Sequence, residues 1–237
     1  MTERKLSSRD NFLVDVLKGL AVHFESPLIE DVLETARRYP KPELGFALNR
    51  NQTASKKWLL DKLYRAVGGD LGGVAVLGGW YGVLAAFLLH DPRFAISRAV
   101  SVDIDPGCEA IANCLNGVHW RDGSFRAATC DMMGLAYDGY PLRALKENGG
   151  TETLSFSPDT VINTSCEHLS DFSAWFDRLP KGRRLVLQSN DYEGIAGHVN
   201  CSDSLAAFKR QAPVAEILFE GEKKMDKYSR FMLIGIK

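Results

Sequence analysis

The chain has 237 residues, of which 45% are hydrophobic and 25% charged. This composition is typical of a globular protein with one large domain, alone or with a helical extension. Its 29 Lys and Arg residues nearly balance its 30 Asp and Glu residues. Such a balance lacks the basic excess of proteins that bind nucleic acid or anionic membranes, so it argues against both kinds of partner.

The cysteines and the apolar segments indicate in which cellular compartment the protein is expected. The chain has five cysteines, Cys108, Cys114, Cys130, Cys166 and Cys201. No two of them form a C-x-x-C pair, which argues against a disulfide framework and against a zinc site. Residues 1–9 are polar, and the longest apolar run, residues 83–89, is too short to cross a bilayer. We expect a cytoplasmic protein with reduced thiols, no metal site and no membrane partner.

The first part of the chain predicts helices. Apolar residues recur at helical spacing over residues 11–24, 27–39 and 55–67, and Ser26-Pro27 is a helix-start signal. A glycine-rich segment at residues 68–73 reads as a hinge or turn. The sequence therefore indicates an N-terminal helical extension or lid over residues 1–68 and a second unit over residues 69–237.

The second unit alternates short apolar runs with amphipathic segments. Strands are expected over residues 74–77, 99–103, 125–129, 159–163 and 184–189, and helices over 83–90, 106–116, 171–177 and 202–209. Two further strands, 214–219 and 230–236, have no helix between them and favour an antiparallel hairpin. The expected fold is α/β, a doubly wound, mostly parallel seven-stranded sheet with a C-terminal antiparallel hairpin.

Two strand-end features point to a nucleotide-like ligand. The loop after the first strand reads Gly78-Gly79-Trp80-Tyr81-Gly82 and lets the backbone approach a ligand, although such a loop is also compatible with a plain tight turn. Asp103 ends the second strand 21 residues after Gly82, a spacing typical of an acid that accepts hydrogen bonds from ribose hydroxyls. Asp105, which precedes Pro106, is the better helix N-cap.

With Asp131 at the end of the third strand, residues 74–237 resemble the class I S-adenosylmethionine-dependent methyltransferases. The resemblance implies that S-adenosyl-L-methionine is the cofactor, that Asp131 receives its adenine amino group, and that Ile104 and Met132 wall the ring. It also places Asn163, at the end of the fourth strand, on the cofactor side.

One departure from the family pattern concerns the glycine loop. The family has an acidic residue two positions before its first glycine and a glycine at the loop centre, where this chain has Val76 and Trp80. The donor's amino group must then be held differently, for example by an N-terminal side chain. Trp80 or Tyr81 could face the sulfonium through a cation–π contact. Equally, Trp80 could pack under the N-terminal helices.

The resemblance places the methyl acceptor at two polar loops. Glu167-His168 follows the fourth strand, where a Glu-His pair recurs in the family, and His168 could act as a base while Glu167 binds an amine. Asp191 and Tyr192 follow the fifth strand with further polar residues, Asn190, His198 and Asn200. The alternative for Glu167 and His168 is a purely structural loop role.

Two more segments refine the expectation. Residues 163–166 lack the Pro-Pro-Tyr/Phe segment of DNA amino-methyltransferases, so DNA amino methylation is not supported. Residues 49–58 could cover the cofactor as a lid, with Asn51, Gln52 or Lys56 touching donor or acceptor.

The expected function is methyl transfer from S-adenosylmethionine to a small-molecule acceptor with an amine, hydroxyl or similar group. Three alternatives stay open: an RNA methyltransferase, an NAD-dependent oxidoreductase and a non-catalytic nucleotide-binding protein of the same fold. The C-terminal hairpin, Asp131 and the polar fourth-strand loop argue against NAD. The sequence contains no signal for an oligomeric state.

Overall fold

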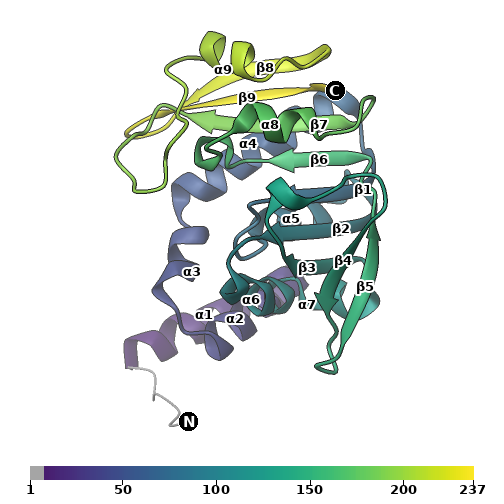
Figure 1. The fold of residues 1–237 in the computed structure, drawn as a ribbon. Coiled ribbons are helices and arrows are strands. Elements are labelled where there is room, and N and C mark those ends of the chain that lie inside the picture. Colours follow the sequence, from purple (N-terminus) through teal and green to yellow (C-terminus); the bar gives the residue numbers. More distant parts are fainter. Residues whose placement is uncertain (1–7) are drawn as a thin grey trace.

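A computed structural model describes residues 8–237 and shows a twisted sheet with helices on both faces (Figure 1). Residues 1–7, on which the expected cytoplasmic location partly rests, lie outside the described residues. The strands of the large sheet are β1 Asp70–Leu77, β2 Ala95–Asp103, β3 Phe125–Thr129, β6 Thr160–Asn163, β7 Arg184–Asn190, β8 Glu216–Lys224 and β9 Ser229–Ile236. No helix within residues 8–237 is long and apolar enough to cross a membrane.

The large sheet has the predicted topology. Its seven strands follow the order β3-β2-β1-β6-β7-β9-β8. The first five are parallel, whereas β9 lies between β7 and β8 and runs antiparallel to both. The expected doubly wound sheet with a C-terminal antiparallel hairpin is therefore confirmed. The strand order reverses between β1 and β6, and open α/β sheets bind ligands at the carboxyl ends of the strands beside such a switch point.

Alternation along each strand supplies two buried faces. Val74 and Val76 of β1 face one core cluster, and Ala75 and Leu77 face the other. Three helices cover the first face: α4 Arg50–Val67, α5 Val83–Leu89 and α6 Pro106–Leu115. The second face is covered by α8 Phe172–Asp177, α9 Leu205–Gln211 and a separate hairpin, β4 Tyr140–Leu145 with β5 Thr151–Phe156.

The β4–β5 hairpin was not expected from the sequence. It packs Leu142, Leu154 and Phe156 against the second face, where a crossover helix would otherwise lie. Its turn contains Asn148-Gly149, with Gly149 at φ +79°. Asn-Gly between two alternating segments is a strong hairpin signal, so the information was present locally. Two short helices, α3 Pro42–Ala47 and α7 Gly117–Asp122, were also not predicted.

The glycine-rich segment is mostly strand rather than hinge. Gly68 ends α4 at φ +78°, but β1 already begins at Asp70 and contains Gly72 and Gly73. The β1–β2 register shifts on both sides of Gly72, and Gly73 N donates to Asp159 Oδ2 at 2.8 Å. Glycine serves here because the strand is irregular and another side chain approaches its backbone closely.

The N-terminal helices do not all lie over the carboxyl edge of the sheet, as a lid would. Helix α1, Ser8–Phe24, packs on α2, Pro27–Arg38, and α2 packs on α6. Asp31 of α2 accepts a hydrogen bond from Val118 N at 3.0 Å. Helix α4 is instead part of the core, with Leu59 and Leu63 fully buried against the sheet. Only α3 and the first turns of α4 adjoin the carboxyl edge (Figure 1).

Candidate functional site

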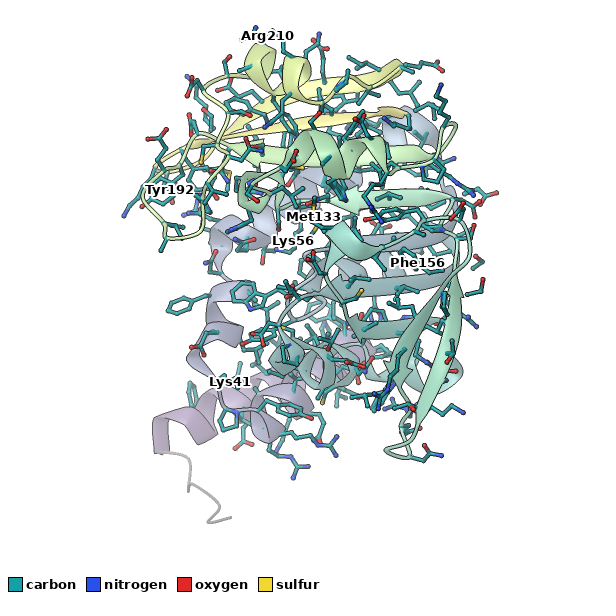
Figure 2. The ribbon with its side chains drawn as sticks, in the orientation of Figure 1. Lys41, Lys56, Met133, Phe156, Tyr192 and Arg210 are labelled. Carbon is teal, nitrogen blue, oxygen red and sulfur yellow. The ribbon has the colours of Figure 1, made fainter. Side chains whose placement is uncertain are left out.

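A cavity of about 930 Å³ lies at the carboxyl ends of the parallel strands. Its walls come from the loops after β1, β2, β3, β6 and β7, from the start of α4, and from the β8–β9 hairpin. Segments far apart in sequence thus share one space, as expected where the carboxyl ends of parallel strands meet. Figure 2 places Lys56 and Met133, two of the lining residues, in the middle of the molecule.

The glycine loop forms one wall through Gly78, Gly79, Trp80 and Tyr81. Gly78 has φ +59°, and a Cβ on Gly79 would lie 2.0 Å from Ser101 Oγ, so both positions require glycine. Trp80 also has a left-handed backbone, at φ +48°. A non-glycine residue there stores roughly 1–3 kcal/mol of strain, which explains why the family usually has glycine at this position.

Two contacts hold Trp80 in this conformation. Its N–H donates to Asp103 Oδ2 at 2.7 Å, and its ring stacks on Tyr81 with centroids 5.0 Å apart. The Trp80 side chain packs against the cluster that contains Leu44 and Ala47 of α3, and it also lines the cavity. Packing under an N-terminal helix and contact with a ligand are therefore compatible.

Four predicted cofactor residues, Asp103, Ile104, Asp131 and Met132, line the cavity. Asp103 Oδ1 accepts from Asp105 N at 3.0 Å, and Asp105 caps α6 as predicted, accepting from Gly107 N at 2.8 Å. Asp131 is exposed and caps the short helix Met132–Gly134. Ile104 is 68% exposed, a large apolar side chain left open to solvent at the cavity.

Two other predicted cofactor residues lie outside the lining. Gly82 is the N-cap of α5 at φ +73°, where an added Cβ would meet Asn116 Nδ2 at 2.7 Å. Asn163 is fully buried, and its Oδ1 accepts from Ser165 N at 2.9 Å. Both residues shape the loops around the cavity without facing it.

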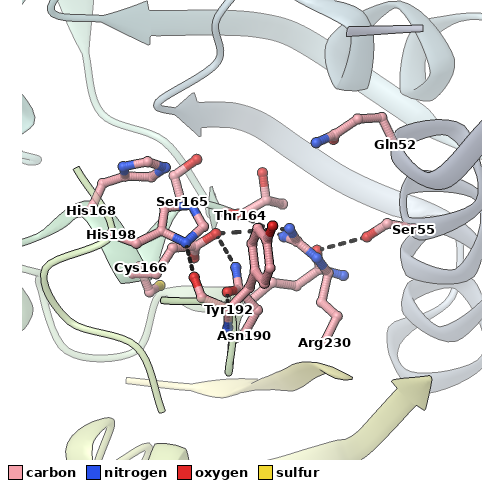
Figure 3. Close-up of polar contacts among 12 residues, drawn as sticks. Gln52, Ser55, Thr164, Ser165, Cys166, His168, Asn190, Tyr192, His198 and Arg230 are labelled. Atoms are coloured by element: carbon pink, nitrogen blue, oxygen red, sulfur yellow. Dashed lines mark hydrogen bonds and ion pairs between the residues drawn. The ribbon is translucent and has the colours of Figure 1, made fainter. Parts of the chain in front are cut away.

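The other end of the cavity has a buried polar floor (Figure 3). Glu167 is 2% exposed, and its Oε1 accepts from Asn190 Nδ2 at 2.5 Å and lies 3.8 Å from an Arg230 guanidinium nitrogen. Glu167 Oε2 is buried and has no hydrogen-bond partner among residues 8–237. Arg230, also buried, donates to Thr164 O at 3.1 Å. A buried carboxylate with one free oxygen is costly unless a ligand satisfies it.

His168 and Tyr192 also line the cavity, as does His198. The rings of His168 and His198 contact edge to face, with centroids 4.7 Å apart, and Tyr192 stacks on Tyr228 at 5.7 Å. The loops after β6 and β7 are joined because Val199 N and Asn200 N both donate to Glu167 O, at 3.0 and 2.9 Å.

Asp191 does not face the cavity. It is exposed, and its Oδ1 accepts from Ser229 N at 2.7 Å. Asn200 is also absent from the lining and donates to Cys166 O at 3.4 Å. In a strand, neighbouring side chains point in opposite directions, and the end of β7 directs Asn190 inward and the following Asp191 outward. Asp191, predicted to reach a methyl acceptor, is therefore not among the residues that line the cavity.

Helix α4 contributes side chains whose role the sequence left undefined. Ser55 Oγ donates to the buried Gln188 Oε1 at 3.3 Å, a pair 133 residues apart. Lys56 lines the cavity, and its Nζ donates to Gln52 Oε1 at 2.8 Å. Burial, helped by the nearby Arg230 charge, lowers the pKa of Lys56 from 10.5 to about 7. No local signal distinguishes Lys56 from the exposed Lys57, because burial here depends on where α4 meets the sheet.

The comparisons with known proteins rest on structure alone, since no protein-family model and no curated protein matches the chain. The N-methyltransferase NodS from Bradyrhizobium japonicum WM9, in complex with S-adenosyl-L-homocysteine, is similar at TM-score 0.56 and 12% identity, over 86% of this chain and 98% of that chain. Geranyl diphosphate C-methyltransferase from Streptomyces coelicolor A3(2), also with S-adenosyl-L-homocysteine, is similar at TM-score 0.52 and 14% identity, over 78% of this chain and 77% of that chain.

The small RNA methyltransferase HEN1 is similar at TM-score 0.56 and 14% identity, over 77% of this chain and 25% of that chain. The acceptors in these three names differ widely, so the likeness does not select an acceptor. The strand order, the C-terminal hairpin and these similarities agree, and the chain has the fold of the class I S-adenosylmethionine-dependent methyltransferases.

Proposed function

We propose that this protein transfers the methyl group of S-adenosylmethionine to a small-molecule acceptor that carries an amine or hydroxyl group. One observation carries the proposal. A single cavity joins the glycine loop and two strand-end acids, at one end, to a buried polar floor with an unsatisfied carboxylate oxygen at the other. Such an arrangement has room for a nucleoside and a polar acceptor side by side in one cavity.

The donor would occupy the end formed by the glycine loop, Asp103 and Asp131. A carboxylate has about four lone-pair sites, and Asp103 uses two of them on Trp80 N and Asp105 N, so ribose hydroxyls can use the others. Val76 cannot hold the donor's amino group. Asn51 and Gln52 at the start of α4 line the same cavity and offer amide oxygens for it.

The acceptor would occupy the end formed by Glu167, His168, Gln188 and Tyr192. Methyl transfer is an in-line displacement in which the nucleophile of the acceptor attacks the methyl carbon and the sulfonium leaves as a neutral thioether. The protein must align the two molecules and remove a proton from an amine or hydroxyl acceptor. Lys56 and His168 both line the cavity, and we propose Lys56 as the group that takes this proton because its pKa of about 7 makes a neutral amine available near neutral pH.

Calorimetry tests the proposed cofactor. Titration with S-adenosylhomocysteine should show one site per chain, and NAD should give no saturable heat at the same concentrations. Saturable NAD binding without S-adenosylhomocysteine binding would instead support an oxidoreductase. Binding of S-adenosylhomocysteine without turnover on amine, hydroxyl or RNA acceptors would support a non-catalytic protein.

Asp131 offers a test of donor orientation. If its carboxylate accepts from the adenine amino group, wild-type protein should bind S-adenosylhomocysteine more tightly than the hypoxanthine analogue, which has a carbonyl there. Asp131→Ala should reduce this preference several-fold, because about 1 kcal/mol of hydrogen bonding is lost. Asp138→Ala, an exposed acid outside the cavity, is the control. Full wild-type preference in Asp131→Ala would show that Asp131 does not read the amino group.

A further inference from the structure

We propose that Glu167, His168 and His198 form a binding site for one divalent transition-metal ion. One carboxylate oxygen of Glu167 and one ring nitrogen from each histidine all lie within 4.8 Å of one another, on the cavity wall. The donors come from two loops, because Glu167 and His168 follow β6 and His198 follows β7. Figure 3 shows His168 and His198 side by side. The proposal concerns these side chains and does not depend on methyl transfer.

Hydrogen bonds orient both imidazoles for metal binding. His168 Nδ1 lies 2.9 Å from Gly197 O, and His198 Nδ1 lies 2.5 Å from Tyr192 O. A carbonyl oxygen only accepts, so Nδ1 carries the hydrogen in each ring, and the lone pair of the neutral ring is on Nε2. A backbone carbonyl that holds one ring nitrogen in this way is typical of histidines that ligate a metal through the other.

Glu167 supplies the independent evidence for a ligand. Its Oε1 accepts from Asn190 and lies near Arg230, whereas Oε2 is fully buried and has no partner in the part of the chain that the structure describes. The protein thus holds one oxygen of this carboxylate in place, and one oxygen of the same carboxylate lies within 4.8 Å of a ring nitrogen of each imidazole. A bound cation would satisfy Oε2 and offset the cost of burying the charge.

The donor types select the kind of ion. Mg²⁺ and Ca²⁺ prefer all-oxygen sites, whereas imidazole favours Zn²⁺ and the neighbouring transition ions. Two histidines and one carboxylate are also the protein ligands of several catalytic zinc sites, which keep an open position for water or substrate. Here the open position would face the cavity, where a bound ion could polarise an oxygen of a molecule at the polar end.

The cysteine pattern of the sequence led us to expect no metal. Glu167, His168 and His198 were expected on the acceptor side and carry no cysteine motif. The third donor, His198, lies thirty residues after His168, too far for a local ligand motif. It comes close to Glu167 and His168 only because the loops after β6 and β7 pack together.

Co²⁺ and Zn²⁺ are suitable probes, because Co²⁺ bound by nitrogen and oxygen has visible absorption bands that report its ligands. The full chain, stripped with a chelator and kept reduced, should bind one equivalent of Co²⁺ that Zn²⁺ displaces. His168→Ala and His198→Ala should each weaken Co²⁺ binding at least tenfold and change the spectrum. His23→Ala, which removes an exposed histidine on α1, should bind like wild type.

A second control addresses the cysteines. Cys201 Sγ lies 3.9 Å from His198 Nδ1, so Cys201→Ser should leave Co²⁺ binding unchanged if the ligand set is as proposed. Affinity for S-adenosylhomocysteine and the thermal midpoint, measured on every variant, separate loss of the ion from loss of the fold. Absence of a Co²⁺ equivalent in folded wild-type protein overturns the proposal. Wild-type Co²⁺ binding by His198→Ala overturns it too, and would leave Glu167 Oε2 as the partner of a cationic acceptor group.

Discussion

Replacement of Lys56 by methionine should lower turnover by roughly 10²–10⁴-fold, the usual contribution of a general base, while leaving affinity for S-adenosylhomocysteine nearly unchanged. Methionine keeps the length and apolar stem of lysine and removes the amine. Lys56 adjoins the proposed donor residues only through its hydrogen bond to Gln52, so the loss should be mainly in kcat. Lys57→Met, an exposed neighbour on α4, is the matched control.

The pH profile provides the second readout. Lys56 accepts a proton only when neutral, so turnover should rise as the pH rises through about 7 and then level off. Burial and the Arg230 charge both lower the pKa of Lys56. The residual activity of Lys56→Met should lack this step. If Lys56→Met keeps both the pH-dependent rise and wild-type turnover, a group other than Lys56 acts as the base.

The same substitution should make the fold more stable. In the unfolded chain the pKa of Lys56 is near 10.5, and in the folded protein it is about 7. Between these values the unfolded state binds more protons, so the penalty is complete below pH 7 and fades as the pH rises towards 10.5. The full shift corresponds to roughly 4–5 kcal/mol, and partial access of water should reduce it to about 2 kcal/mol. Urea unfolding of Lys56→Met and Lys57→Met at pH 7 measures the difference.

Replacement of Asp103 by alanine should weaken binding of S-adenosylhomocysteine by roughly 10–100-fold, because two charge-assisted hydrogen bonds to the ribose are lost. The substitution also removes the acceptor of Trp80 N–H, which helps to hold Trp80 at φ +48°. Part of the lost affinity should therefore come from a looser glycine loop.

Asp103→Asn separates the two contributions. The amide keeps one oxygen that can accept from Trp80 N–H but carries no charge, so its affinity should lie between those of wild type and Asp103→Ala. Asp138→Ala serves as the surface control, and calorimetry gives all three affinities. Wild-type affinity in Asp103→Ala would remove Asp103 from the donor site, and donor binding would then have to rest on the loop backbone.

Local patterns in the sequence were sufficient to predict the fold. Alternating apolar runs, helix-start signals such as Asp105-Pro106, and the missing helix between the last two strands predicted the sheet, its helices and its hairpin. These signals are readable because periodicity and capping involve residues within a few positions of one another. The β4–β5 hairpin had such a signal in Asn148-Gly149, and it could have been predicted by the same reasoning.

The residues proposed to bind the donor could be placed at one edge of the sheet from the sequence, because a residue at the carboxyl end of a central parallel strand lies at the same edge as its neighbours. Gly78, Gly79, Asp103 and Asp131 line the cavity for that reason. Which way a side chain turns after the strand ends does not follow from position. Asn163 and Asp191 were expected to face the ligand. Instead, their side-chain oxygens accept hydrogen bonds from Ser165 N and Ser229 N, respectively.

Only the tertiary structure decided the chemistry at the other end of the cavity. Glu167 is buried with one free oxygen because Asn190 and Arg230, from β7 and β9, close over it. The pKa of Lys56 is lowered because α4 packs into the core and brings Lys56 near Arg230. Desolvation and the distance between charges depend on segments that meet only after folding, so composition and spacing along the chain do not contain them.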